Sequence, residues 1–204
     1  MCRRFSCKLT WDELVRLYRL TLDQPPRNTQ ARYNVCPTDP ISYDSGLRGK
    51  RELVPMRWGL VPSWWSKSLK DVKMATFNAR AETVETKSFF RDAFKRTRCL
   101  IPVSGYYEWH ATSGGKQPWY FTARDGSPAL TVAGLWDEWK DRETGERLKC
   151  RTMIITGPTT SLPMCTTACR SFLAKKCATA RQSQAIRALA ERGGGCRIFE
   201  ASSQ

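Results

Sequence analysis

The chain has 204 residues, of which 41% are hydrophobic and 26% are charged. This balance is typical of a single soluble globular domain and argues against a disordered chain. No apolar run approaches the roughly 20 residues that a membrane helix needs. The N-terminal segment carries arginines without an apolar core, so we expect no secretory signal peptide. The sequence therefore predicts a cytoplasmic protein, associated with the nucleoid if the source is bacterial.

The formal net charge is +15, because 34 lysines and arginines oppose 19 aspartates and glutamates. Such a cationic chain favours a polyanionic partner, foremost nucleic acid, although general basicity without a partner is an open alternative. The nine cysteines are an odd number, and the chain has a single histidine, His110. These features argue against a disulfide framework and against a metal site, since the cysteine spacings do not match the usual ligand patterns.

Residues 10–22 are predicted to form an amphipathic helix that begins at a capping box of Thr10 and Glu13. A second, short helix is predicted over residues 86–96. Apolar stretches bounded by Gly and Pro indicate strands joined by hairpin-like turns. The pattern predicts an α+β fold, mostly antiparallel β-sheet and barrel-like, with a few short flanking helices. The predicted strands are Leu53–Leu60, Cys99–Trp109, Pro118–Ala123, Ala129–Trp139 and Arg151–Thr156.

The character of the sequence changes near residue 160. Residues 161–204 contain four of the nine cysteines, a run of three glycines, and seven basic against two acidic residues. Residues 179–192 have helical propensity, but no strand pattern continues. We therefore expect one domain over residues 1–160 and a poorly packed tail over residues 161–204.

Cys2 is the first candidate for chemistry. The small residue at position two favours removal of Met1, which would leave Cys2 as the N-terminus. The pKa of an α-amine is about 8, so much of it is neutral near pH 7. The amine can form an imine with an aldehyde, and the thiolate can then close a five-membered thiazolidine. The open form of an abasic deoxyribose is such an aldehyde. A disordered terminus without function is the alternative.

An aromatic pair, Trp64-Trp65, is followed by Lys67, Lys70 and Lys73. Adjacent rings beside lysines suit base stacking along a phosphate track. Burial of the pair in the core is the alternative, although neighbouring side chains tend to point apart.

Three polar residues stand out further along the chain. The amide of Asn78 both donates and accepts hydrogen bonds, and Arg80 suits a phosphate; a solvated turn is the alternative for both. Glu108 lies among large aromatic residues, where partial burial would raise its pKa and suit it to acid–base work. A solvent-facing position on an edge strand is the alternative for Glu108.

These motifs, in this order, resemble the SOS response-associated peptidase (SRAP) family, the abasic-site processing proteins. The resemblance covers roughly residues 1–160. The stretches that carry it are MCRRF at 1–5, RYNVCPT at 32–38, WGLVPSWW at 58–65, FNARAET at 77–83, CLIP at 99–102, GYYEW at 105–109, KQP at 116–118 and MIIT at 153–156.

The resemblance implies a protein that binds single-stranded DNA at an abasic site and forms a thiazolidine crosslink through Cys2. It implies that Asn78 steadies the amine and the sugar, and that Glu108 moves protons during imine formation and ring opening. The proposed peptidase step is self-removal of the residues before the cysteine, here Met1 alone. We expect a monomer that needs no cofactor and no membrane. The positions implied to contact DNA are Arg4, Pro37, Trp64, Trp65 and Arg80.

The sequence also departs from the family. Arg3 stands where the family has glycine, and Cys36 where it has alanine. The His-Asp-Arg-Met-Pro motif, whose histidine belongs to the family's active site, is missing. His110 shares a strand and a face with Glu108 and is a poor substitute, because the two do not converge from separate strands.

Codons can be chosen for Thr160–Leu173 that encode the missing motif when they are read one base earlier. We therefore hypothesise a single-base slip near codons 157–160, which would explain the cysteine-rich tail and the absent histidine together. A non-catalytic protein that binds single-stranded DNA, and an inactive pseudogene product, are the two alternatives to a crosslinking protein.

Overall fold

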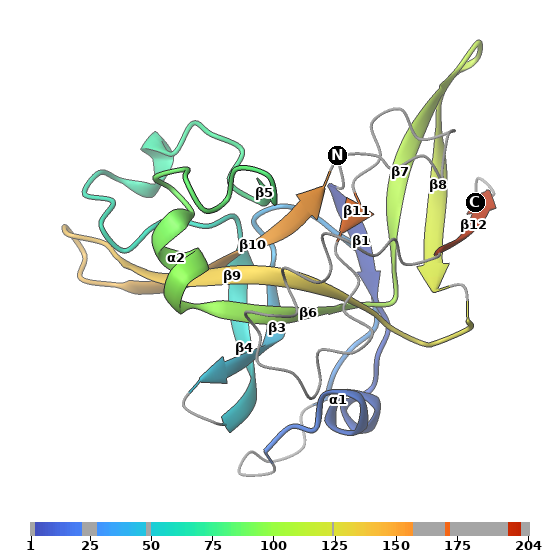
Figure 1. Cartoon of the computed structure of the whole chain (residues 1–204), viewed down its shortest axis with the longest axis horizontal. Coiled ribbons are helices and arrows are strands. Elements are labelled where there is room, and N and C mark those ends of the chain that lie inside the picture. The colour runs from blue at the N-terminus through green and yellow to red at the C-terminus, as the bar shows by residue number, and fades with distance from the viewer. Residues whose placement is uncertain are drawn as a thin grey trace.

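The computed structural model describes residues 3–21, 28–47, 50–123, 125–156, 170–171 and 196–200. Within these ranges the chain forms two β-sheets with short helices outside them (Figure 1). This arrangement confirms the predicted α+β fold of mostly antiparallel, barrel-like sheet. None of the helices in the described part of the chain has the length and hydropathy that a membrane crossing requires.

The larger sheet closes on itself. Five of its strands pair in the order β10-β4-β3-β6-β9, and β9 pairs in turn with β10, so the ring is complete. The pairings are antiparallel except those of β10 with β4 and with β5, which are parallel. Its strands are β3 (Pro40–Leu47), β4 (Lys50–Trp58), β5 (Asn78–Arg80), β6 (Arg98–Val103), β9 (Leu130–Lys140), β10 (Arg147–Thr156) and β11 (Arg170–Ser171).

The smaller sheet has the strand order β12-β8-β7-β1-β2, all antiparallel. The core lies between the two sheets, where the ring of Phe5 from β1 meets that of Trp58 from β4 edge-on, with centroids 5.0 Å apart. Both side chains are fully buried. The strands of this sheet are β1 (Arg4–Cys7), β2 (Arg32–Val35), β7 (Gly105–Thr112), β8 (Gly115–Ala123) and β12 (Cys196–Glu200).

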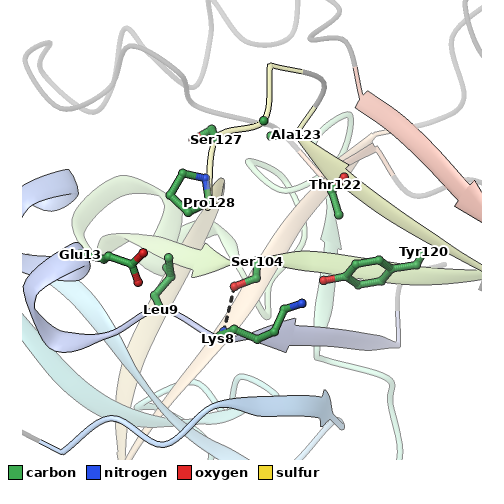
Figure 2. Close-up of a pocket in the computed structure, with 10 residues that line it drawn as sticks. Lys8, Leu9, Glu13, Ser104, Tyr120, Thr122, Ala123, Ser127 and Pro128 are labelled. Carbon is green, nitrogen blue, oxygen red and sulfur yellow. Dashed lines mark hydrogen bonds between the residues drawn. The ribbon is translucent and has the colours of Figure 1, made fainter.

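The apolar run Cys99–Trp109, predicted as one strand, is divided between the two sheets. The chain leaves the barrel-like sheet after Val103 and enters the smaller sheet at Gly105. Ser104 holds the crossing point, since its backbone N–H donates to Ser6 O at 2.8 Å and its hydroxyl accepts from the Lys8 N–H at 2.8 Å (Figure 2). Nearly every side chain in the run is buried on both sides of the crossing. The hydropathy of the run therefore does not show where the chain passes from one sheet to the other.

The first predicted helix exists and is shorter than expected. Helix α1 (Trp11–Tyr18) begins at the predicted capping box, in which Thr10 and Glu13 bond each other's backbone N–H groups. It ends at Arg19, whose left-handed backbone (φ 51°) stops the helix before residue 22.

The second predicted helix is also shorter. Helix α2 (Arg91–Arg96) covers the second half of the range 86–96, and turns occupy residues 86–90. A 3₁₀ turn, η1 (Leu69–Asp71), lies in the loop after β4.

The sequence shows no strand pattern after residue 160, yet two short strands lie there. β11 pairs with the end of β10, and β12 pairs with β8 at the edge of the smaller sheet. An edge strand offers free backbone groups whatever the partner's side chains are, so such pairing needs no hydrophobic pattern. The predicted helix over residues 179–192 lies outside the described residues.

Candidate active site

Strand β1 carries the beginning of the described chain between β7 and β2. Arg4 lies opposite Tyr107, and Phe5 lies opposite Tyr106. Directly opposite residues in an antiparallel pair project to the same face, and Phe5 and Tyr106 both belong to the core between the sheets. The same register continued by one residue sets Arg3 opposite Glu108. Met1 and the predicted nucleophile Cys2 lie outside the described residues.

Glu108 faces the layer between the two sheets. It is two residues from the buried Tyr106 on β7, so the two side chains share a face, and only 7% of Glu108 is exposed. Strand β7 is an interior strand, flanked by β1 and β8. The alternative of a solvent-facing carboxylate on an edge strand is therefore wrong.

Asn78 reaches the same layer from the barrel-like sheet. It begins β5 and lies opposite Met153 of β10, which belongs to the core cluster that contains Phe5. Only 9% of Asn78 is exposed, so a solvated turn is wrong for this residue. Arg80, at the other end of the same short strand, is exposed.

A contact of Arg3 joins these two halves of the site. Its guanidinium carbon lies 5.8 Å from the centroid of the Phe77 ring, a geometry in which the cation is attracted to the ring face. The backbone of Phe77 is fixed, because its carbonyl accepts from Trp58 Nε1 at 2.8 Å. The residue after Cys2 thus touches the residue before Asn78, and Arg3 stacks on an aromatic ring.

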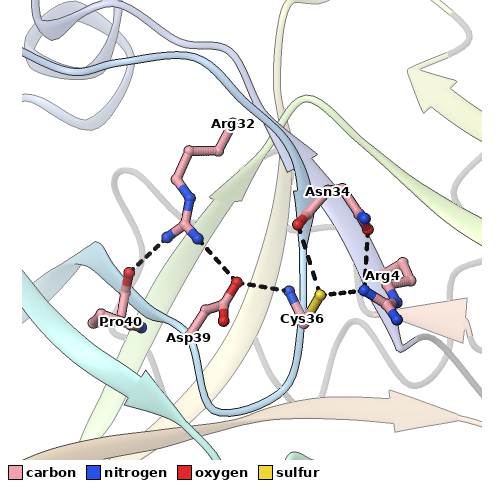
Figure 3. Close-up of polar contacts among 6 residues, drawn as sticks. All are labelled: Arg4, Arg32, Asn34, Cys36, Asp39 and Pro40. Carbon is pink, nitrogen blue, oxygen red and sulfur yellow. Dashed lines mark hydrogen bonds and ion pairs between the residues drawn. The ribbon is translucent and has the colours of Figure 1, made fainter.

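Arg4 points away from the core toward the turn that follows β2 (Figure 3). Its Nη1 atom donates to Oδ1 of Asn34 at 3.3 Å and to the sulfur of Cys36. The contact with sulfur exists because position 36 is cysteine, the residue that departs from the family's alanine.

An ion pair shapes the same turn around Pro37. Nη2 of Arg32 lies 2.9 Å from Oδ2 of Asp39, and this oxygen also accepts from the Cys36 N–H at 3.1 Å (Figure 3). Thr38 takes a left-handed backbone (φ 78°) and donates its N–H to Trp58 O at 2.7 Å. Two of the implied DNA-contacting residues, Arg4 and Pro37, are thereby brought to one end of the smaller sheet.

The aromatic pair is split between surface and interior, as its adjacency predicted. Trp64 is 46% exposed, whereas Trp65 is half-buried against the apolar cluster beneath the loop. Both rings pack on Phe89, with centroids 5.5 Å and 5.4 Å away. The alternative of a pair buried together in the core is wrong, and Trp64 presents the larger free surface.

Arg151 is a buried charged residue that sequence analysis missed. It is fully buried on β10, and its guanidinium carbon lies 5.7 Å from the Phe5 ring centroid and 5.4 Å from that of Trp58. The sequence pattern that could have predicted its burial is the alternation of Arg151 with Met153 and Ile155, which puts the arginine on an otherwise apolar face of the strand. Arg151 brings a positive charge into the layer that holds Glu108 and Asn78.

The cysteines and acidic groups add no metal centre to this part of the chain. Among the described residues, no group of three His, Cys, Asp or Glu side chains is placed to hold a metal ion. The free thiols in these ranges are Cys7, Cys36, Cys99 and Cys150.

Comparison of the sequence with known protein families identifies the family of this chain. The sequence model of the SOS response associated peptidase (SRAP) family matches residues 1–165. The chain belongs to this family. The match contains every candidate site residue, from Cys2 through Asn78 to Glu108.

Curated SRAP relatives are named for abasic sites. The chain is 32% identical over 159 residues to abasic site processing protein YoaM of Bacillus subtilis (strain 168), which covers 78% of this chain and 68% of YoaM. It is 36% identical over 124 residues to abasic site processing protein HMCES of Gallus gallus, which covers 52% of this chain and 37% of HMCES.

Solved structures share the SRAP-type fold. A protein of Bacteroides thetaiotaomicron superposes with a TM-score of 0.78 at 21% identity, over 98% of this chain and 91% of that one. A protein of Bordetella bronchiseptica superposes with a TM-score of 0.81 at 20% identity, over 99% of this chain and all (100%) of that one. At such identities the likeness concerns the fold alone.

Proposed function

We propose that this SRAP protein processes abasic sites in single-stranded DNA by capturing them covalently through Cys2. One observation carries the proposal: Asn78 and Glu108, 9% and 7% exposed, come from different sheets into one layer beside the start of β1. Arg3, which directly follows Cys2 in the chain, contacts Phe77, the residue before Asn78. The names of the SRAP relatives support abasic-site processing as the family's work.

The proposed reaction is a condensation that needs neither oxidant nor reductant. After Met1 is removed, the neutral α-amine of Cys2 adds to the C1′ aldehyde of the open abasic sugar, and loss of one water gives an imine. The thiolate then adds to the imine carbon, forming a C–S bond. The electrons of the C=N bond move to nitrogen, which takes up a proton. The product is a thiazolidine that links protein and DNA.

The buried polar residues have distinct roles in this proposal. Glu108 delivers a proton to the leaving hydroxyl when the imine forms, and it accepts one when the reaction runs backward. A positioned acid or base of this kind contributes roughly 10²–10⁴ in rate. Asn78 orients the amine and the sugar by hydrogen bonds. Arg4, Pro37, Trp64 and Arg80 hold the flanking strand, and Trp65 supports Trp64 from beneath.

A denaturing gel tests the proposal. The Met-processed protein is incubated with single-stranded DNA that carries one abasic site, and a band of reduced mobility is expected. The band should vanish in Cys2→Ser. It should form about 10²–10⁴ times more slowly in Glu108→Gln, while the exposed Glu85→Gln serves as the matched control. A folded protein that gives no band, or an unchanged band in Cys2→Ser, would contradict the proposal.

The exposed ring of Trp64 favours a second candidate, a non-catalytic protein that binds single-stranded DNA. The exposed Lys67, Lys70 and Lys73 follow it in the same loop, so stacking and charge alone would bind a strand. Retained DNA binding without a covalent band would support this candidate. An aggregated preparation would instead support an inactive pseudogene product.

We propose that the tail from about residue 161 arises from a shifted reading frame. The family match ends at residue 165, which is within the segment where the sequence changes character. Sequencing of the gene over codons 157–173 tests this proposal. Codons that do not encode His-Asp-Arg-Met-Pro in the neighbouring frame would contradict it.

A further inference from the structure

Lys8 is held between two tyrosine rings on the side of the smaller sheet that faces away from the core. Its Nζ atom lies 5.6 Å from the centroid of Tyr33 and 5.7 Å from that of Tyr120. Tyr33 belongs to β2, Tyr120 belongs to β8, and Lys8 directly follows β1; we call these three residues the Lys8 cluster. Lys8 is exposed, and Tyr33 is 62% exposed, so the cluster presents an ammonium group beside a free aromatic face.

The position of Tyr120 in the Lys8 cluster is built into the sheet. A Cβ atom at Gly105 would overlap Cζ of Tyr120, so the ring lies across β7 only because Gly105 has no side chain. The hydroxyl of Tyr120 then reaches Ser6 Oγ on β1 at 2.5 Å. The Tyr107 ring packs on its other side, with centroids 4.8 Å apart. The cation therefore sits on a fixed aromatic platform.

A pocket of about 360 Å³ opens beside the Lys8 cluster, between the start of α1 and the turn after β8 (Figure 2). Lys8, Ser104, Thr122 and Ser127 are among the residues that line it, and the Ser127 hydroxyl already donates to Ala129 O at 3.2 Å. An ammonium group and hydroxyl groups are the donors that a phosphate takes. The one carboxylate on the wall, Glu13, accepts through Oε2 from the Thr10 N–H at 2.8 Å and from the Thr10 hydroxyl at 3.0 Å.

The Lys8 cluster is continuous with the candidate active site along β1. Arg4 and Ser6 flank the buried Phe5 on β1, so their side chains share the outer face, and Lys8, directly after the strand, lies over the Tyr120 ring that Ser6 contacts. At about 3.3 Å per residue, Arg4 and Lys8 are about 13 Å apart along the strand, a span of a few nucleotides. The net charge of +15 makes the chain complementary to a polyanion.

We propose that the DNA strand flanking the abasic site runs from Arg4 over the outer face of the smaller sheet, where Lys8 binds a backbone phosphate and Tyr33 stacks on a base. This inference rests on the proposed function, because the strand's position at Arg4 follows from it. The Lys8 cluster extends the contact beyond the reacting nucleotide. It makes capture dependent on the length of the strand.

Oligonucleotide length gives the test a readout that a merely structural role of Lys8 would not move. Binding of single strands of about 3 and about 20 nucleotides, each with one central, non-reactive tetrahydrofuran analogue of the abasic site, is measured by anisotropy at several salt concentrations. Lys8→Ala should weaken binding of the long strand about 3–10-fold and reduce the slope of log K against log salt by about 0.7, the value for one phosphate on a single strand. The short strand, confined to the abasic site, should bind the variant and the parent equally.

Two matched variants complete the experiment. Lys140→Ala removes an exposed lysine at the end of β9 in the other sheet, and it should leave length dependence unchanged. Tyr33→Phe keeps the ring and should bind like the parent, whereas Tyr33→Ala should lose affinity for the long strand only.

Equal effects of Lys8→Ala and Lys140→Ala, or equal losses on short and long strands, would overturn the inference. So would full competition by inorganic phosphate at constant ionic strength, which would mark a site for a small free anion. If the parent forms no covalent band, the proposed function fails, and the same anisotropy series on undamaged single strands still tests Lys8 separately.

Discussion

The thiol of Cys150 and the backbone of Val61 bond to each other in both directions. The Val61 N–H donates to Sγ at 3.1 Å, and the thiol donates to Val61 O at 3.2 Å. Cys150 belongs to β10, and Val61 lies in the segment that leads to the aromatic pair. The contact therefore anchors the Trp64–Trp65 loop to the barrel-like sheet.

Cys150 should be inert in the folded protein. Burial raises the pKa of its thiol to about 12, so at pH 8 it holds roughly a thousandfold less thiolate than a cysteine of ordinary pKa. Labelling with iodoacetamide, mapped by mass spectrometry, should modify the half-exposed Cys36 and spare Cys150 until the protein unfolds. Equal labelling of the two in the folded state would contradict this.

The same thiol makes stability depend on alkaline pH. Because the pKa of Cys150 in the folded state lies above the ordinary value of 9.0, the folded protein keeps a proton that the unfolded chain releases. The contribution is complete below pH 9 and is lost as the pH rises toward about 12. Urea unfolding at pH 8 and pH 10 should show a fall in the parent that is smaller in Cys150→Ala.

Trp64 and Trp65 should separate binding from stability. Trp64→Ala should weaken binding of single-stranded DNA by about 1–3 kcal/mol and lower stability by only about 0.5–1.5 kcal/mol, because its ring is about half exposed and keeps its edge contact with Phe89. Trp65→Ala should lower the free energy of unfolding by about 2–4 kcal/mol, because its ring fills the cluster under the loop. Anisotropy and urea unfolding measure the two effects, and a reversed pattern would show that the rings have exchanged roles.

Gly105 and Tyr120 should be coupled. Gly105→Ala should destabilise the protein by about 1–3 kcal/mol, since its Cβ would meet the Tyr120 ring. In a Tyr120→Ala background the same change should cost less, and the double-mutant cycle measures the difference. Gly114→Ala is the control, because no heavy atom lies within 4 Å of a Cβ built there. An additive cycle would mean that the ring does not occupy this place.

Arg151 should be a structural requirement of the layer between the sheets. Arg151→Ala should lower the free energy of unfolding by about 2–5 kcal/mol, because it leaves a cavity between Phe5 and Trp58. Arg151→Met, which keeps most of the volume, should cost less. Urea unfolding compares both with the exposed Arg142→Ala; equal stability of Arg151→Ala and Arg142→Ala would refute the role.

Restoring the hypothesised reading frame should raise the rate of crosslinking. A chain that regains the family's histidine would gain a second acid or base, worth roughly 10²–10⁴ in rate. The gel assay on this chain and on the restored chain measures the gain. Equal rates would show that Asn78 and Glu108 suffice.

Much of the local structure was predictable from the sequence. The capping box of Thr10 and Glu13, the strands around 53–58, 118–123 and 130–139, and the separation of the Trp64 and Trp65 side chains all follow from near neighbours in the chain. Short strands such as β1 and β5, with four and three residues, were not predicted, because three or four residues are too few to display the apolar–polar alternation that indicates a strand. The linked motifs nevertheless identified the family, since their order is written in the chain itself.

What the sequence by itself determined is therefore the set of chemical groups: a cysteine at position two, a polar trio at 78, 80 and 108, and a strong positive charge. The tertiary structure decided which of them meet. It broke one apolar run at Ser104 so that Glu108 entered the smaller sheet, and it stacked Arg3 on Phe77 beside Asn78. It also placed Lys8 between Tyr33 and Tyr120. Such contacts depend on the register of strands that are distant in the chain, and hydrophobic periodicity carries no information about register between them.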